Sequence, residues 1–320
     1  MLLVGPLGPL FADPRVTEIV VNGPERVFVE VGGRLQRTDT AFRDAVELRQ
    51  VISRLVGLCG RRIDDSTPLV DARLPDGSRV NAVLPPLAVD GPLLTIRRFG
   101  ARPISADELV QLGTLTQEDA GLLAAVVRAR LNVLVCGGTS SGKTTTLAAL
   151  TAFVAPEERI VSVEDAAELQ LGAPHVARLE ARPATPDGRG AIDLRALVRN
   201  ALRMRPDRLV VGEVRGGEAL DLLLAMNTGH DGSMATIHAN GPADALRRLE
   251  TMALMGGVDV PHSAVRESIA SAVHVVLHQT RSADGRRKIV DVAAVVARDA
   301  GWAVEGRDAL RAMVEGRVSG

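Results

Sequence analysis

One glycine-rich segment has the residue types and spacing that hold nucleotide phosphates. In "VCGGTSSGKTTTL", residues 135–147, the pattern G-x-x-x-x-G-K-[ST] follows an apolar run and precedes a helix-forming one. Backbone N–H groups in such a loop bind phosphate oxygens, the lysine neutralises β/γ-phosphate charge, and the hydroxyl suits Mg²⁺. Ser140 stands where many such loops have another glycine. We expect this segment to bind nucleotide through Gly137, Gly138, Thr139, Ser140, Ser141, Gly142, Lys143, Thr144 and Thr145.

Carboxylates follow two apolar runs that are typical of buried strands. Glu164 and Asp165 directly follow "RIVSV", and Glu213 directly follows "DRLVVG". Carboxyl ends of parallel strands face the crevice where ligands bind in open α/β sheets, so these groups could organise metal and water. We expect Glu213 to polarise an attacking water, as a general base does. The alternative for each carboxylate is an ordinary solvated charge at a helix start.

The run "DRLVVG" before Glu213 lacks the aspartate that usually precedes the glutamate of a Walker B motif. Gly212 occupies that place, so no side chain there can ligate a metal. We expect Mg²⁺ to depend on Thr144, the phosphates and waters, with Glu164 and Glu213 as the candidate carboxylates near the metal.

Two histidines lie in "NTGHDGSMATIHAN". His230 follows a Thr-Gly turn, and His238 ends a strand-like run eight residues later. This spacing differs from the helical i, i+4 pair of zinc proteases, and no cysteine is near, which argues against zinc. We expect hydrogen bonding to the γ-phosphate or catalytic water; the alternative is two histidines satisfied by backbone groups.

Arginines form a further set of candidates. Phosphoryl transfer gains from an arginine that reaches the γ-phosphate from outside the phosphate loop, often from another subunit. Solvated stems are the alternative interpretation for each of them. The candidates are Arg73, Arg79, Arg97 and Arg98 in the first part of the chain and Arg215 after Glu213.

Length and composition indicate a globular protein of two domains. The chain has 320 residues, 46% of them hydrophobic and 24% charged, with a net charge of −1. With a net charge near zero, no basic surface that attracts nucleic acid is expected. Only 2% of the residues are aromatic, so no base-stacking surface is expected either. Cys59 and Cys136 have no metal-ligand spacing, and a buried free thiol is expected at Cys136 in a reducing compartment.

Residues 1–99 are expected to form a small α+β domain, because short β-rich runs and Asn-Gly or Pro-Asp-Gly turns flank a single helical pattern. Residues 100–107 read as a linker, and Ser105 with Glu108 forms a capping-box pattern at the next helix. Residues 108–320 alternate strand and helix, which favours a mainly parallel sheet covered by helices. Strands are predicted near 131–136, 159–163, 208–213 and 233–238, helices near 117–129, 143–154, 192–204, 217–227, 242–253 and 262–271, and a hairpin around Asp284-Gly285.

No membrane-spanning segment is expected. The opening "MLLVGPLGPLFADP" lacks a basic start and contains Gly and Pro, and no later apolar run approaches the ~20 residues that a spanning helix needs. We expect a cytoplasmic protein that docks on a membrane complex. The tail from Ala300 to Gly320 is weakly patterned, and no structure is predicted there.

Four motifs in order resemble the signatures of the type II/type IV secretion ATPase superfamily. They are Walker A in "GGTSSGKTTT", the Asp box in "IVSVEDAAELQL", an atypical Walker B in "RPDRLVVGEVRGGEA" and the His box in "TGHDGSMATIHAN". Residues 60–99, "GRRIDDSTPLVDARLPDGSRVNAVLPPLAVDGPLLTIRRF", resemble the CpaF/TadA branch, which powers assembly of tight-adherence (Flp) pili. The resemblance extends from about Asp13 to Val296.

The resemblance implies a RecA-like P-loop ATPase domain preceded by a small α+β, PAS-like domain. It implies ATP and Mg²⁺ as ligands, a homohexameric ring, and docking on an inner-membrane platform protein. The residues that match the motifs are Lys143 and Thr144 for phosphate and Mg²⁺, Glu213 as catalytic carboxylate, Glu164 and Asp165 in the Asp box, and His230 and His238 in the His box.

Two alternatives stay open at this point. A VirB-type or conjugative-transfer ATPase would use the same site on a different platform. A regulatory nucleotide-binding subunit would turn over little, although the retained Glu213 and His238 argue against it.

Overall fold

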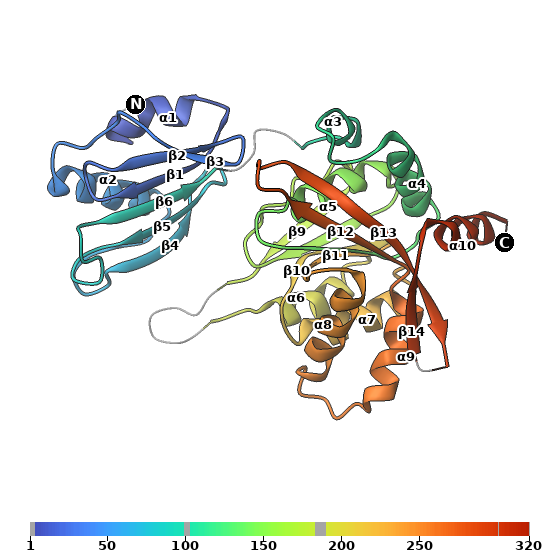
Figure 1. The fold of residues 1–320 in the computed structure, drawn as a ribbon. Coiled ribbons are helices and arrows are strands. Elements are labelled where there is room, and N and C mark those ends of the chain that lie inside the picture. Colours follow the sequence, from blue (N-terminus) through green and yellow to red (C-terminus); the bar gives the residue numbers. More distant parts are fainter. Residues whose placement is uncertain (1–3, 99–102, 183–189, 300, 320) are drawn as a thin grey trace. The chain divides into compact units, whose positions relative to one another are not determined.

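The computed structural model describes residues 4–98, 103–182, 190–299 and 301–319 (Figure 1). The chain divides into two compact units, Met1–Arg102 and Pro103–Gly320. Each unit has its own hydrophobic core, so each is described by itself. The proposed linker at 100–107 lies partly outside the described residues, and its capping box at Ser105 and Glu108 is present.

The first unit is a six-stranded antiparallel sheet with helix α2 packed on one face (Figure 1). Alternation of buried and exposed residues in the strands leaves the other face open. Helix α2 starts where the Asp44 side chain accepts a hydrogen bond from the Glu47 N–H at 2.8 Å, and it buries Val51, Ile52 and Leu55. The strand order is β3-β2-β1-β6-β5-β4. The elements are η1 (Gly5–Leu7), α1 (Gly8–Ala12), β1 (Val16–Asn22), β2 (Val27–Val31), β3 (Arg34–Arg37), α2 (Ala45–Leu58), β4 (Leu69–Arg73), β5 (Arg79–Val83) and β6 (Leu93–Arg97).

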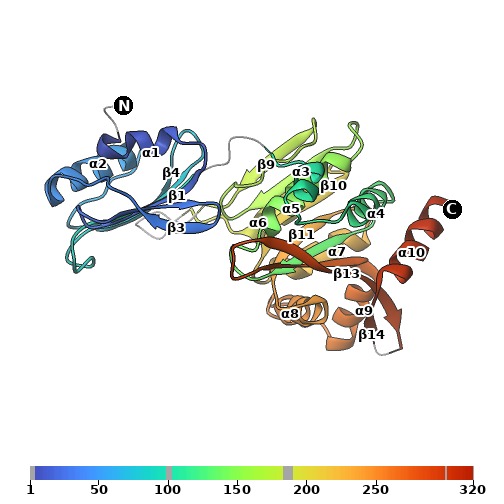
Figure 2. The same ribbon diagram turned by 45° about the horizontal axis from the view of Figure 1, so that its top comes forward.

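The second unit is built on an eight-stranded sheet of order β14-β13-β12-β7-β11-β10-β8-β9. Figure 2 labels its strands β9, β10, β11, β13 and β14. The run from β12 to β9 is parallel, and β13 and β14 are antiparallel additions. The strands are β7 (Val133–Gly137), β8 (Ile160–Glu164), β9 (Val176–Glu180), β10 (Arg208–Val214), β11 (Met234–His238), β12 (Val275–Arg281), β13 (Arg287–Arg298) and β14 (Gly301–Glu305).

Helices cover both faces of this sheet. One buried cluster joins α6, α7, α8 and α9 to one face, and a second joins α3, α4, α5 and α10 to the other. Nearly continuous apolar strands such as β7, in which all five residues are buried, are what a doubly covered parallel sheet requires. The helices are α3 (Ala106–Gln111), α4 (Gln117–Arg128), α5 (Lys143–Leu150) with η2 (Thr151–Phe153), α6 (Leu194–Ala201), α7 (Glu218–Asn227), α8 (Pro242–Leu254), α9 (His262–Ala272) and α10 (Arg307–Ser319).

The structure confirms the predicted α/β class and the core strands and helices. It adds elements that the sequence analysis did not predict: the edge strand β9, and β14 and α10 in the tail.

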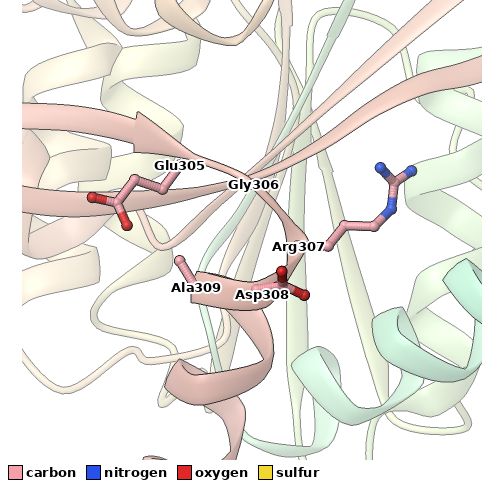
Figure 3. A pocket seen from close by; sticks show the side chains of 5 residues that line it. All are labelled: Glu305, Gly306, Arg307, Asp308 and Ala309. Carbon is pink, nitrogen blue, oxygen red and sulfur yellow. The ribbon is translucent and has the colours of Figure 1, made fainter.

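Between β14 and α10 the side chains of Glu305 and Arg307 point apart around a small pocket (Figure 3). Arg307 Nε lies 2.8 Å from Oδ1 of the buried Asp119, so an ion pair joins α10 to α4.

Candidate nucleotide site

The phosphate loop connects β7 to α5 and needs its glycines for two separate reasons. Gly137 is so close to the neighbouring strand that a Cβ there would lie 2.1 Å from the carbonyl oxygen of Gln279. Gly142 has a φ of 96°, in the left-handed region that costs other residues about 1–2 kcal/mol. Ser140 adopts φ 56° without being glycine, which accounts for the glycine at this position in many such loops.

Lys143 is held against its own loop. Its side chain is buried, and Nζ donates to the carbonyl oxygens of Gly137 at 3.1 Å and Gly138 at 2.9 Å. Burial lowers the pKa of the Lys143 ammonium, while the nearby Glu213 carboxylate opposes that shift. The ammonium therefore lies at the mouth of the loop, at the amino end of α5, where anions bind.

Glu213 lies between a histidine and an arginine. Its Oε1 is 3.0 Å from Nε2 of His238, and its Oε2 is 2.7 Å from Nη2 of Arg215. A register shift between Val211 and Val214 in the β10–β11 pairing turns this part of β10, as bulges beside active sites do. His238 and Arg215 thus each hold one oxygen of the Glu213 carboxylate in place.

His238 links Glu213 to the phosphate loop. Its backbone pairs with Gly137 at the carboxyl ends of β11 and β7, and its Nε2 is 3.5 Å from Nζ of Lys143. Burial, followed by the Lys143 charge, lowers the pKa of His238, so the neutral imidazole is favoured. A neutral ring that donates from Nε2 to Glu213 cannot also accept from Lys143 there, so the 3.5 Å approach is a contact.

Glu164 ends β8 beside β10 and is buried. Its Oε2 accepts hydrogen bonds from the backbone N–H groups of Glu168 at 2.7 Å and Leu169 at 2.8 Å. Its Oε1 is buried and has no hydrogen-bond partner among the described residues. Burial raises the pKa of the Glu164 carboxyl. Asp165 next to it lies 3.4 Å from Arg215 Nη1, so Arg215 connects Asp165 to Glu213.

The residues present fit a magnesium ion. The buried, unpaired Oε1 of Glu164 is an oxygen donor of the kind that Mg²⁺ and its waters prefer, and Thr144 opens α5 beside Lys143. Among the described residues no three His, Cys, Asp or Glu side chains cluster as a preformed metal site.

His230 was grouped with the catalytic residues in the sequence analysis, and the structure places it elsewhere. It precedes β11, whose first residue Met234 pairs with Val133. His230 therefore lies at the amino ends of these strands, whereas Gly137 and His238 lie at their carboxyl ends. Its Nδ1 lies 3.3 Å from the carbonyl oxygen of Ala225. His238 is the last of the five residues of β11, and each strand residue advances about 3.3 Å, so the strand carries His238 away from His230 in space.

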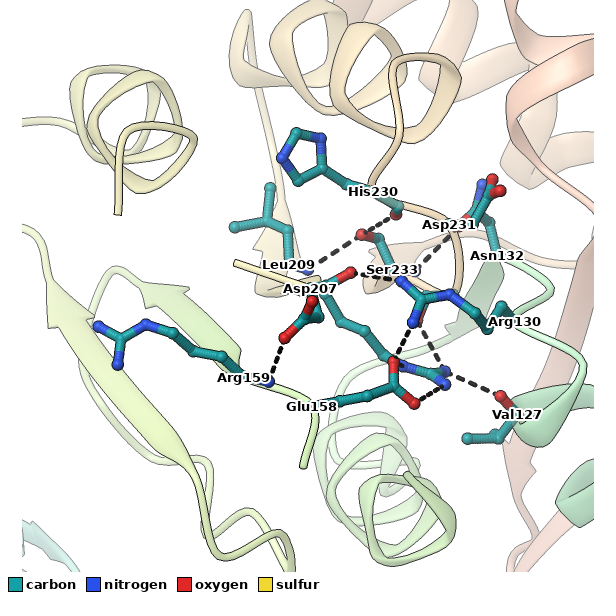
Figure 4. A network of polar contacts seen from close by, with 12 residues as sticks. Val127, Arg130, Asn132, Glu158, Arg159, Asp207, Leu209, His230, Asp231 and Ser233 are labelled. Atoms are coloured by element: carbon teal, nitrogen blue, oxygen red, sulfur yellow. Dashed lines mark hydrogen bonds and ion pairs between the residues drawn. The ribbon is translucent and has the colours of Figure 1, made fainter. Parts of the chain in front are cut away.

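The turn that contains His230 belongs to a structural network (Figure 4). The Ser233 hydroxyl donates to the His230 carbonyl at 2.7 Å and accepts from the Leu209 N–H at 3.0 Å. The fully buried Arg208, next to Leu209 in the chain, forms an ion pair with Glu158 at 2.7 Å and donates to the carbonyl of Val127 at 2.8 Å. This part of the His box therefore fixes the amino ends of β10 and β11.

The candidate arginines of the first unit divide into two groups. Arg73, Arg79 and Arg97 are cross-strand neighbours on β4, β5 and β6, on the face that α2 does not cover. Arg98 instead donates from Nη1 to the carbonyl oxygens of Asp13 at 2.6 Å and Val16 at 3.3 Å. That contact ties the start of β1 to the end of β6, which is a structural role.

Sequence reasoning missed two residues beside the phosphate loop. Gln279 on β12 and Arg287 on β13 both approach Gly142, within 3.0 Å of where its Cβ would lie. Neither belongs to a motif, and the only signal was the predicted hairpin, whose position beside β7 depends on the sheet order.

A mainly parallel sheet with a phosphate loop after its central strand, acidic groups on nearby strand ends and helices on both faces defines a RecA-like P-loop ATPase. The family model described as "Type II/IV secretion system protein" matches residues 4–318, so the chain belongs to that family of ATP-hydrolysing enzymes. The predicted membership of the superfamily and the predicted ATPase activity are thereby confirmed.

The chain is similar to a putative conjugal transfer protein of Mycobacterium tuberculosis, with 45% identity over 90% of this chain and 83% of the relative. It is 37% identical to the conjugal transfer protein TrbB of Rhizobium radiobacter over 86% of this chain and 82% of that one. The X-ray structure of the Legionella pneumophila ATPase DotB has the same fold, with a TM-score of 0.63 and 23% identity over 96% of this chain and 84% of DotB. Within the described part of the chain, no helix is long and apolar enough to cross a membrane.

Proposed function

We propose that this chain is the ATPase motor of a conjugal-transfer or type IV secretion machine. The observation that carries the proposal is the convergence of Lys143, His238 and Glu213 at the carboxyl ends of β7, β11 and β10. The names of the relatives, conjugal transfer proteins at up to 45% identity, favour this class of machine. The sequence analysis put the tight-adherence pilus first, and the relatives favour its alternative.

In this proposal each residue has one task at the nucleotide. Lys143 and the loop N–H groups bind the β- and γ-phosphates, and Thr144 with Glu164 would hold Mg²⁺, which neutralises phosphate charge when bound. Glu213 orients the attacking water and accepts its proton. Arg215 and neutral His238 keep the Glu213 carboxylate in position, each through one oxygen.

Assembly is the second part of the proposal. We infer a homohexameric ring at the cytoplasmic face of the inner membrane, bound to a membrane platform protein. Arg73, Arg79 and Arg97 would complete the nucleotide sites, since they are cross-strand neighbours on the sheet face that α2 does not cover. Association by this face agrees with the expectation that phosphoryl transfer uses arginines from outside the phosphate loop.

The test compares the unmodified chain with Glu213→Gln. Phosphate release should fall at least 100-fold while ATP still binds, because the isosteric amide keeps the shape but cannot accept the proton. Light scattering with and without a non-hydrolysable ATP analogue should show a ring. Equal hydrolysis by both proteins, or a monomer under all conditions, would contradict the motor function.

The tight-adherence pilus remains the second candidate, favoured by the resemblance of residues 60–99. Purification of the ATPase from its own host with its bound membrane proteins separates the two. A pilus platform protein among them would favour the pilus, and conjugation-channel subunits would favour transfer.

A further inference from the structure

The hairpin of β12 and β13 forms one wall of the phosphate loop. β12 pairs in parallel with β7, so that Gln279 lies opposite Gly137. β13 then returns antiparallel to β12, and its first residue Arg287 pairs with Arg281. The two strands bring Gln279 and Arg287 to the loop from a part of the chain about 140 residues away in sequence.

Arg287 reaches across to the loop itself. Its Nε donates to the carbonyl oxygen of Ser140 at 3.2 Å, and its Cδ would lie 3.0 Å from a Cβ on Gly142. Gly142 is the residue before the first turn of α5. The guanidinium therefore lies at the amino end of that helix, beside Lys143, with its Nη groups still able to donate.

This position favours a bound anion. The amino end of a helix carries partial positive charge, and the exposed Arg287 guanidinium adds a full one there. No carboxylate among the described residues forms an ion pair with Arg287. By contrast, its neighbour Arg286 is paired with Asp284 at 3.2 Å.

A second polar group at the same wall is also unsatisfied. The Gln279 side chain is 1% exposed and its Nε2 would lie 3.0 Å from a Cβ on Gly142. Its Oε1 has no hydrogen-bond partner within the described ranges. Buried side-chain amides normally find partners. The unpaired atom is an acceptor and does not bind phosphate itself, so the donor at this wall is the Arg287 guanidinium.

We propose that Arg287 is a further phosphate-binding residue of the nucleotide site. Its Nε fixes the loop at Ser140, and its Nη groups contact the phosphate chain from the side opposite to Glu213 and His238. Arginine suits this task because its planar fork can bind loop and phosphate at the same time. The inference rests on the proposed nucleotide site and extends it to the β12–β13 hairpin.

The test measures binding directly and does not depend on turnover. Calorimetry with ADP and with inorganic pyrophosphate is done on the unmodified chain, Arg287→Ala, Arg287→Lys and the matched hairpin control Arg286→Ala. Arg287→Ala should weaken both ligands at least 10-fold, Arg287→Lys should recover part of the loss, and Arg286→Ala should bind normally. Without ligand, the melting temperature of each variant is measured as a check that it folds.

Other outcomes would overturn the inference in distinguishable ways. A lower melting temperature with unchanged dissociation constants would make Arg287 a brace of the loop. A loss for ADP but not for pyrophosphate would place the contact at the base or ribose. If the unmodified chain fails to bind ADP, or if Lys143→Ala binds it normally, the nucleotide site itself is wrong and this inference falls with it.

Discussion

The side chain of Glu164 packs directly against Gly212 and fills the space that a side chain at position 212 would need. A Cβ on Gly212 would lie 2.8 Å from Cγ of Glu164, and Oε2 of Glu164 is fixed by two backbone N–H groups, so the carboxylate cannot retreat easily. The missing Walker B aspartate is thus a packing consequence: Glu164 on β8 fills the place that a side chain at position 212 would take.

Gly212→Ala should destabilise the second unit by about 1–3 kcal/mol, because overpacking a tight site costs about that much. In a Glu164→Ala background the same change should cost little, since Cγ is gone. Urea unfolding of the four proteins gives the coupling energy. Gly121→Ala on α4, where a Cβ would meet nothing within 4 Å, is the control and should be neutral or stabilising. Additive effects of the two substitutions would contradict the contact.

His238→Ala should lower kcat by about 10- to 100-fold, because Glu213 loses one of its two positioning contacts. Phosphate release from saturating ATP measures it, and His175→Ala, an exposed histidine, is the control. In the unmodified enzyme, burial lowers the pKa of His238 from its ordinary value of 6.5, so the neutral ring predominates at pH 6.5 and above. The acid limb of the pH profile of kcat that depends on His238 should therefore lie below pH 6.5. An acid limb above pH 6.5 would be inconsistent with the buried position of His238.

His274 should make stability depend on pH. Its Nδ1 accepts from the Asn132 N–H at 3.0 Å, and burial lowers its pKa to about 4. Between pH 4 and 6.5 the unfolded chain binds the proton and the folded chain does not, so stability is lost as pH falls through this window. The loss is about 3 kcal/mol.

Denaturant unfolding between pH 4 and 7 measures this effect against His274→Gln. The glutamine oxygen can accept the same hydrogen bond but does not titrate, so the difference between the two proteins should shrink toward pH 4. Curves that stay parallel over the whole range would show that His274 does not contribute.

Glu158→Gln should destabilise the second unit by about 3 kcal/mol, because it leaves the buried Arg208 guanidinium without its carboxylate. Thermal unfolding compares this variant with Glu157→Gln, its exposed neighbour, which should be near neutral. Equal melting temperatures for the two variants would mean that the network of Figure 4 is not needed for stability.

The sequence by itself determined the phosphate loop, the core strands and helices, and the acidic groups at strand ends. These depend on local physics: glycines at Gly137 and Gly142 permit a loop that curls around phosphate, and apolar periodicity specifies buried strands. The matched motifs also sufficed to predict the family and its ATPase activity.

Only the tertiary structure decided which groups meet. Strand order places β11 between β7 and β10 and β12 on the other side of β7, so His238 joins Lys143 and Glu213 while Arg287 joins the opposite wall. The position of His230 at the far sheet edge and the conflict between Gly212 and Glu164 also depend on pairing between distant segments. A motif specifies residue types along one segment, whereas such contacts depend on how the strands pair.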